Sequence, residues 1–266
     1  MYDLLTLEAE LSASSFAGKL HFSRVTGSTN NDAVAAARLG APHGSVFLAD
    51  EQLAGRGRGD HGWISAAGEG VYVSVLLRPQ FPTAHLPFLP LAAGLAAADA
   101  IRAVSGLAVD LRWPNDLLIG SRKAGGILLE AHLESKGPPH AVVPHAVLGV
   151  GINVHQRAFP AGLATQATSL DLESGSSISR QALVLALLQS LQQEMLALEN
   201  PDAAKVIVTR IEKTSTWIRG RRVEVHGPQV CTGVTAGLDE NGFLRVATAE
   251  GLVTVQTGGL REKISL

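Results

Sequence analysis

Apolar residues follow two different spacings along the chain, and each spacing predicts one kind of secondary structure. Short apolar runs bounded by Gly, Pro or Asn are typical of strands, whereas apolar positions three or four residues apart predict helices with one buried face. The short runs predict strands at residues 20–25, 45–49, 71–77, 109–113, 117–119, 127–132 and 146–154. The wider spacing predicts helices at residues 29–39, 89–104, 179–198 and 201–213.

Local signals set the ends of two of these elements. Ser28 and Thr29 are residue types that begin helices, and Gly40 is the type that ends them, so they bound the helix at 29–39. Residues 120–123 read Gly-Ser-Arg-Lys between two predicted strands. This pattern predicts a β-hairpin with a basic tip.

The pattern changes near residues 216–220. Short β-like runs follow at residues 223–226, 230–236, 243–247 and 252–256, and glycines punctuate them. Closely spaced short strands with turn signals are typical of a small barrel. We therefore expect two domains, residues 1–216 and 217–266.

Composition and charge narrow the class of protein. Hydrophobic residues make up 46% and charged residues 17% of the chain, which excludes a disordered protein. The formal net charge of −2 does not favour general binding to nucleic acid or to a membrane surface. Cys231 is the only cysteine, so no intrachain disulfide can form. We see no cationic leader and no run of about 18 apolar residues, and we expect a cytoplasmic protein without a membrane partner.

Residues 55–59 read Gly-Arg-Gly-Arg-Gly and follow a predicted strand. Glycines free the backbone so that its amides can surround an anion, and Arg56 and Arg58 add fixed positive charge. The pattern suits a phosphate or a carboxylate, although it matches neither the dinucleotide fingerprint nor the Walker motif. A solvated surface loop is the alternative interpretation of this segment alone.

Three further segments carry candidate chemistry. Residues 112–116, Arg-Trp-Pro-Asn-Asp, place polar groups at the end of a predicted strand, and an ordinary turn is the alternative. Lys123 precedes Ala and two glycines, so it can approach a ligand closely or, alternatively, lie in a solvated hairpin tip. Glycines within residues 149–154 indicate close approach by a ligand or by another part of the backbone. No zinc-binding or Gly-x-Ser-x-Gly pattern is present, so the sequence predicts neither a metal site nor a serine hydrolase.

Taken in order, these segments resemble the motifs of the biotin–protein ligase family. The resemblance rests on Ser28–Asn30, Gln52 with residues 55–58, Trp113–Asp116, Lys123–Gly126 and Gly149–Asn153, and it extends over about residues 20–266. It implies an α+β fold, in which a mixed sheet flanked by helices forms the catalytic domain and a small SH3-like barrel follows. It also implies the substrates biotin and ATP with Mg²⁺, and a biotin carboxyl carrier protein as acceptor.

The resemblance also implies site residues by position. Lys123 would stabilise the reacting carboxylate and the α-phosphate, Arg58 would close over the adenylate, and Asp116 would orient the acceptor amine. The residues implied to bind biotin or biotinyl-AMP are Ser28, Thr29, Asn30, Gln52, Gly55, Arg56, Gly57, Arg58, Trp63, Asn115, Lys123, Gly126, Gly151 and Asn153.

Some positions depart from the family pattern. Arg112 stands where lysine is common, and Asp60 and His61 stand where glycine and arginine are common. Arg261 and Lys263 are candidates for contact with ATP. Some family members carry a DNA-binding module before the catalytic domain, and the 27 residues before Ser28 are too few for one, so we expect no DNA partner. A lipoyl or octanoyl ligase and a non-catalytic biotin-binding regulator remain alternatives, as do a monomer and a homodimer.

Overall fold

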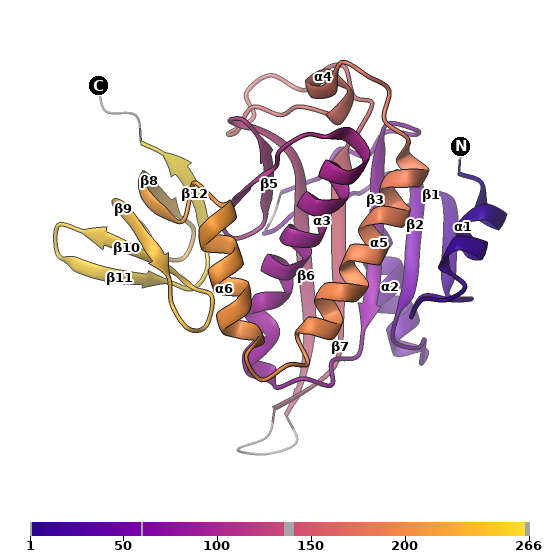
Figure 1. Cartoon of the computed structure of the whole chain (residues 1–266), viewed down its shortest axis with the longest axis horizontal. Coiled ribbons are helices and arrows are strands. Elements are labelled where there is room, and N and C mark those ends of the chain that lie inside the picture. Colours follow the sequence, from indigo (N-terminus) through magenta and orange to yellow (C-terminus); the bar gives the residue numbers. More distant parts are fainter. Residues whose placement is uncertain (1, 60, 136–140, 264–266) are drawn as a thin grey trace.

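The computed structural model describes residues 2–59, 61–135 and 141–263, and places a seven-stranded sheet at its centre (Figure 1). The strand order is β1-β2-β3-β7-β6-β5-β4. Their bounds are β1 Leu20–Thr26, β2 Ser45–Gln52, β3 Gly70–Leu77, β4 Asp110–Arg112, β5 Asp116–Ile119, β6 Arg122–Ser135 and β7 Ala141–Asn153. β1 and β2 are parallel and the other neighbours are antiparallel. The predicted mixed sheet flanked by helices is confirmed.

Helices cover both faces of this sheet. One face carries α3 (Leu89–Ser105), α5 (Arg180–Ala197) and α6 (Ala203–Thr214), whereas α2 (Thr29–Arg38) lies on the other face against β2, β3 and β7 (Figure 1). Because helices lie on both sides, every residue of β3 is buried. This explains why the run at 71–77 is apolar on both faces instead of alternating.

The segment Thr83–Ser105 is long and apolar enough to cross a membrane by length and composition alone. It comprises η1 (Thr83–Phe88) and α3, and 67% of its apolar window is buried inside the protein. Contacts of α3 with α5 and with the sheet account for this apolar character. Gly106 ends α3 in the left-handed conformation, at φ 71°.

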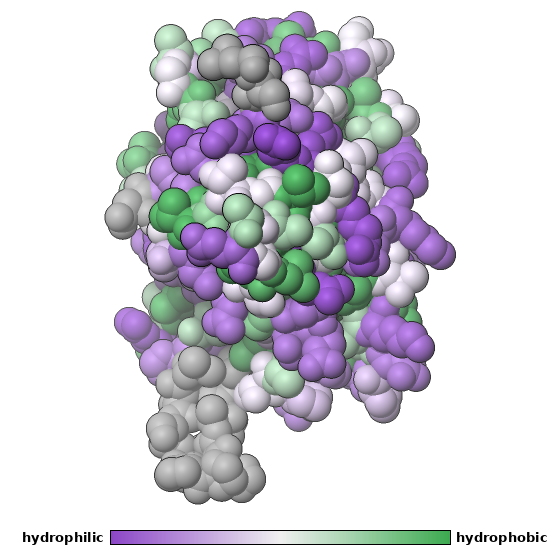
Figure 2. Space-filling view, turned by 90° about the vertical axis from the view of Figure 1, so that its left-hand side faces the viewer, coloured by the Kyte–Doolittle hydropathy of each residue, from purple (hydrophilic) through white to green (hydrophobic). Residues whose placement is uncertain are grey.

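The last part of the chain forms a separate five-stranded antiparallel sheet with the order β11-β10-β9-β8-β12, as expected for a small barrel-like domain. Its strands are β8 Arg219–His226, β9 Cys231–Leu238, β10 Leu244–Thr248, β11 Gly251–Val255 and β12 Gly259–Glu262. Val230, Val234 and Leu252 are exposed in this part of the chain. Figure 2 faces this end of the molecule and shows apolar residues gathered at its centre. The boundary at residues 216 and 217 stays a prediction.

Some expectations about secondary structure are wrong. The sequence did not predict α1 (Leu4–Leu11), α4 (Leu170–Ser174) or β12. The predicted basic hairpin tip is also wrong in part, because β6 already begins at Arg122 and Lys123 lies within the sheet. Pairing of Lys123 with Leu118 turns its side chain toward the protein and not toward solvent.

Candidate active site

The first half of the site is a chain of polar side chains at the start of α2. Thr29 donates from its backbone N and from Oγ1 to Gln52 Oε1, at 2.9 and 3.1 Å. Thr29 Oγ1 also lies 2.7 Å from Ser74 Oγ, which donates to Asn30 Oδ1 at 2.6 Å. Ser28 is the N-cap residue, as predicted, but its buried side chain makes no capping hydrogen bond. Its hydroxyl is therefore available to a ligand.

Three glycines on β6 and β7 form the floor of the site. Trp63 covers two of them: a Cβ on Gly151 would lie 2.6 Å from Trp63 Nε1, and a Cβ on Gly126 would lie 3.5 Å from Trp63 Cζ3. Nε1 of Trp63 is buried and has no hydrogen-bond partner. The indole of Trp63 thus fills the space over Gly151 and Gly126, and its Nε1 is a buried donor that no group of the described residues satisfies.

The third floor glycine, Gly149, gives a stability prediction. A Cβ at this position would lie 2.2 Å from Asn30 Oδ1, and Asn30 is held by hydrogen bonds to Ser74 and Glu130. Gly149→Ala must displace Asn30, so we expect it to lower the free energy of unfolding by about 2 kcal/mol in a urea titration. Gly94→Ala is the matched control, because a Cβ there meets Leu111 at an ordinary 3.4 Å. Equal stabilities of the two variants would contradict the prediction.

The second half of the site is a cluster of charges around Asp116. Its Oδ1 lies 2.5 Å from Lys123 Nζ, and its Oδ2 lies 2.5 Å from Arg112 Nη2. Burial alone would raise the pKa of Asp116, but the charges of Lys123 and Arg112 and the hydrogen bonds they donate outweigh it and hold that pKa below its ordinary value. Asp116 is therefore a carboxylate clamped between two cations.

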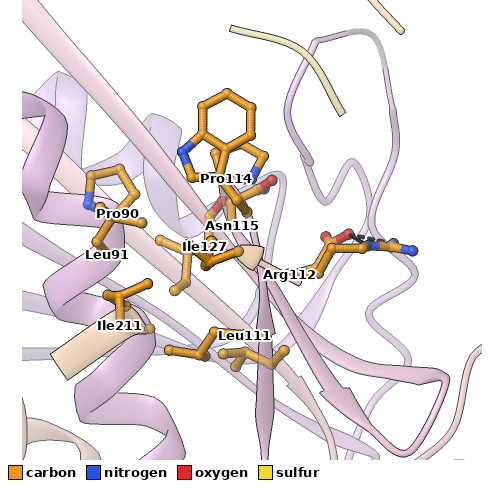
Figure 3. A pocket seen from close by; sticks show the side chains of 13 residues that line it. Pro90, Leu91, Leu111, Arg112, Pro114, Asn115, Ile127 and Ile211 are labelled. Atoms are coloured by element: carbon orange, nitrogen blue, oxygen red, sulfur yellow. Dashed lines mark hydrogen bonds and ion pairs between the residues drawn. The ribbon is translucent and has the colours of Figure 1, made fainter. Parts of the chain in front are cut away.

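Two contacts fix Arg112 beside Asp116. Its Nη2 donates to Thr165 Oγ1 at 2.8 Å, and its guanidinium carbon lies 5.2 Å from the centre of the Trp217 ring. Figure 3 shows Arg112 pointing away from an apolar crevice, which Leu111, Ile127 and Ile211 help to line. Arg112 thus contacts Asp116, Thr165 and Trp217 at once.

Asn115, Asn153 and Trp113 bind protein groups. Asn115 Nδ2 donates to the carbonyl of Ile127 at 2.8 Å, and Asn153 Nδ2 donates to the carbonyl of Thr168 at 2.9 Å. Trp113 donates from Nε1 to the carbonyl of Gly242 in the C-terminal domain, at 3.2 Å. These three side chains brace the strand ends around the pocket, and the predicted contacts of the two asparagines with substrate stay predictions.

The two arginines of residues 55–59 have different partners. Arg58 donates to the carbonyl of Gly258 and to Thr257 Oγ1, so it ties this segment to the C-terminal domain. Burial lowers the pKa of Arg58, and the nearby negative charge of Asp116 acts in the opposite direction. Arg56 instead pairs with Glu130 on β6. Asp60 lies outside the described residues.

The structure brings most of the predicted residues together, at two ends of one glycine floor. Those at the polar end are Ser28, Thr29, Asn30, Gln52 and Trp63, and those at the charged end are Arg58, Asp116 and Lys123. Sequence reasoning missed Ser74, Glu130 and Thr257. The sequence did contain a signal for Ser74, because it is a polar residue within an apolar strand. The structure buries it fully. Within the described residues, no three His, Cys, Asp or Glu side chains gather as metal ligands.

Known proteins resemble the chain in sequence and in fold. The model of the biotin/lipoate A/B protein ligase family matches residues 22–153. The bifunctional ligase/repressor BirA of Bacillus spizizenii is 39% identical over 167 residues, which cover 62% of this chain and 50% of that protein. The biotin–acetyl-CoA-carboxylase ligase of Mycobacterium tuberculosis is 34% identical over 239 residues, which cover 88% of this chain and 85% of that protein. The chain thus spans about half the length of the first relative and most of the second.

A solved structure agrees with these relatives. Biotin protein ligase from Aquifex aeolicus, in complex with biotin and ATP, aligns with a TM-score of 0.78 and 28% identity, and the alignment covers 93% of this chain and 100% of that one. The fold therefore agrees over 93% of this chain, and the sequence of the Mycobacterium tuberculosis relative over 88% of it. The chain belongs to the biotin/lipoate A/B protein ligase family.

Proposed function

We propose that the chain is a biotin–protein ligase, which activates biotin with ATP and transfers it to a lysine of a biotin carboxyl carrier protein. The proposal rests on one observation, that the site has a neutral polar end and a positively charged end. Neutral hydrogen-bonding groups at Ser28, Thr29 and Gln52 suit the ureido ring of biotin, and the cations Arg58 and Lys123 suit a carboxylate meeting a phosphate. The glycines between the two ends let Trp63 and Asn30 pack directly on the backbone of β6 and β7.

In the first step, a carboxylate oxygen of biotin forms a bond to the α-phosphorus of ATP, and the bond from that phosphorus to pyrophosphate breaks. Two anions must approach each other, so the reaction needs positive charge at this point. Lys123 supplies it, and Asp116 keeps the Lys123 ammonium in place at 2.5 Å. Mg²⁺ brought in with ATP would supply further positive charge.

In the second step, the ε-amine of the acceptor lysine forms a bond to the acyl carbon, the bond from that carbon to the phosphate oxygen breaks so that AMP leaves, and the nitrogen loses a proton to solvent. That amine must be neutral to attack, whereas a free lysine has a pKa of about 10.4 and is mostly protonated at neutral pH. A carboxylate can accept several hydrogen bonds, so Asp116 can accept one from the incoming amine while it still holds Lys123. In this way one carboxylate serves both steps.

The test is exchange of labelled pyrophosphate into ATP by purified protein, with biotin or with lipoate as the acid. We expect exchange with biotin and at least about tenfold less with lipoate, because the fused ureido ring has donors and acceptors that the dithiolane ring of lipoate lacks. Exchange with lipoate alone would support a lipoyl ligase instead. Biotin binding by folded protein without exchange would support a non-catalytic binder.

A further inference from the structure

Glu130 is a charged side chain of β6 that contacts both the start of α2 and the segment of residues 55–59. Its Oε1 lies 2.7 Å from Arg56 Nη2, and its Oε2 accepts from Arg56 Nη1 at 3.2 Å. Oε2 also accepts from Asn30 Nδ2 at 2.8 Å. One carboxylate thus joins the start of α2 to residues 55–59.

The partners of Glu130 extend this connection. Arg56 Nη1 also donates to Asn31 Oδ1 at 2.7 Å, so the guanidinium bridges β6 and α2. Asn30 lies directly over Gly149, where a Cβ would meet it at 2.2 Å. The position of residues 55–59 over the pocket is therefore tied to the polar groups around Thr29 through Glu130.

The ion pair between Arg56 and Glu130 is strong enough to hold residues 55–59 closed and exposed enough to let them open. A bidentate bond between arginine and a carboxylate is stronger and more directional than a neutral hydrogen bond. The two side chains are nevertheless 43% and 28% exposed, so salt and water can reach the pair. Substrate entry requires the segment to open, whereas a water-sensitive adenylate requires it to stay closed.

We propose that Glu130 is a positioning residue, which holds residues 55–59 over the pocket through Arg56 and so retains the acyl-adenylate until an acceptor arrives. The inference rests on the proposed function, because it concerns retention of the intermediate of that reaction. Glu130 takes no part in the chemistry itself, because its carboxylate is engaged with Arg56 and Asn30 and not with the Asp116 cluster.

The first experiment tests the contact without substrate, by amide hydrogen exchange of the full chain. Ala54, at the base of the segment, donates its amide to the carbonyl of Gly27 before α2, so opening of the segment exposes this amide. We expect Glu130→Gln to speed exchange there by about tenfold, the factor of a charge-assisted hydrogen bond. The matched control is Glu212→Gln, which removes a 2.8 Å pair with Arg219 of similar exposure elsewhere. Unchanged exchange in Glu130→Gln would overturn the proposal.

The second experiment measures how long the adenylate stays bound when no acceptor is present. We expect Glu130→Gln to release it about tenfold faster, while the maximal rate of pyrophosphate exchange changes less than about threefold. In about 1 M NaCl the wild-type protein should approach the variant, since screening weakens the same contact. A purely structural role would instead lower stability without this dependence on salt.

A double-mutant cycle distinguishes loss of the Arg56–Glu130 contact from a general loss of structure. Adding Glu130→Gln to Arg56→Gln should speed release by less than about twofold, because both changes remove one contact. Additive effects would overturn the proposal. If the wild-type protein forms no adenylate, the proposed function fails, and the amide exchange experiment still decides whether Glu130 holds the segment.

Discussion

Replacing Lys123 with alanine is expected to slow adenylate formation by about 10²- to 10³-fold, the usual loss when one preorganised donor of an anionic transition state is removed. The ammonium lies 2.5 Å from Asp116 and 5.5 Å from the centre of the Trp63 ring, so it is already oriented before substrate binds. An oriented charge needs little reorganisation during the reaction. The measurement is the maximal rate of biotin-dependent pyrophosphate exchange.

The control for this variant is Lys205→Ala, which removes an exposed lysine of α6 on the other face of the sheet. It should exchange at the wild-type rate. The variant Lys123→Ala should remain folded, since Asp116 keeps its bond to Arg112. Near-normal exchange by folded Lys123→Ala would remove Lys123 from the catalytic role and leave Arg58 as the principal cation.

The fold was largely predictable because most of its elements carry local signals. Ser28 and Gly40 bound α2 as expected, and Gly40 has a φ of 89° that few other residue types adopt. Helix α1 was missed because it has only eight residues and depends on its surroundings. Asp3 caps it through Thr6, and Leu7 and Leu11 are buried. A helix this short is stabilised by its cap and by packing against the rest of the protein, and eight residues are too few to show a periodic pattern of their own.

Strand β12 was missed for a related reason. It has four residues, of which only Leu260 is buried, and it is a strand because its backbone pairs with β8. Pairing with a distant strand is not encoded in the side chains of the segment itself. A pattern of alternating apolar residues therefore finds strands that bury a face and overlooks short strands at an edge.

The same reasoning explains which site residues the sequence indicated. Residues in compact motifs, such as Lys123 and Asp116, were found because several unusual residues stand side by side. Glu130 was not found, because its meaning depends on Arg56, which lies 74 positions earlier. The contact of Arg58 with the turn at Gly258 spans 200 positions. Sequence motifs thus indicated residues that the structure gathers at the candidate site, whereas the groups that hold them in place required the structure.

The charge cluster leads to a prediction about stability and pH. Asp116→Asn removes the carboxylate between two cations and leaves both uncompensated, so we expect the free energy of unfolding near pH 7 to fall by about 3 kcal/mol. The pKa of Asp116 is lowered in the folded protein, relative to an ordinary value of 3.8. Its contribution is therefore complete above that value and is lost as the pH falls through the lower, folded pKa.

Urea titrations of both proteins at several pH values test this prediction. The difference in the free energy of unfolding between wild type and Asp116→Asn should stay constant from about pH 7 to about pH 5. It should narrow only below pH 3.8, the pH that equals the ordinary pKa of the group. The control Asp99→Asn removes a carboxylate that is 55% exposed and 3.9 Å from Arg210, and it should change stability by less than about 0.5 kcal/mol. A difference that widens as the pH falls from about 7 towards about 5 would mean that burial outweighs the two cations and raises the pKa of Asp116 above 3.8. A raised pKa would make the ionised form of Asp116 less favourable, and Asp116 would be a weaker partner for both Lys123 and the acceptor amine.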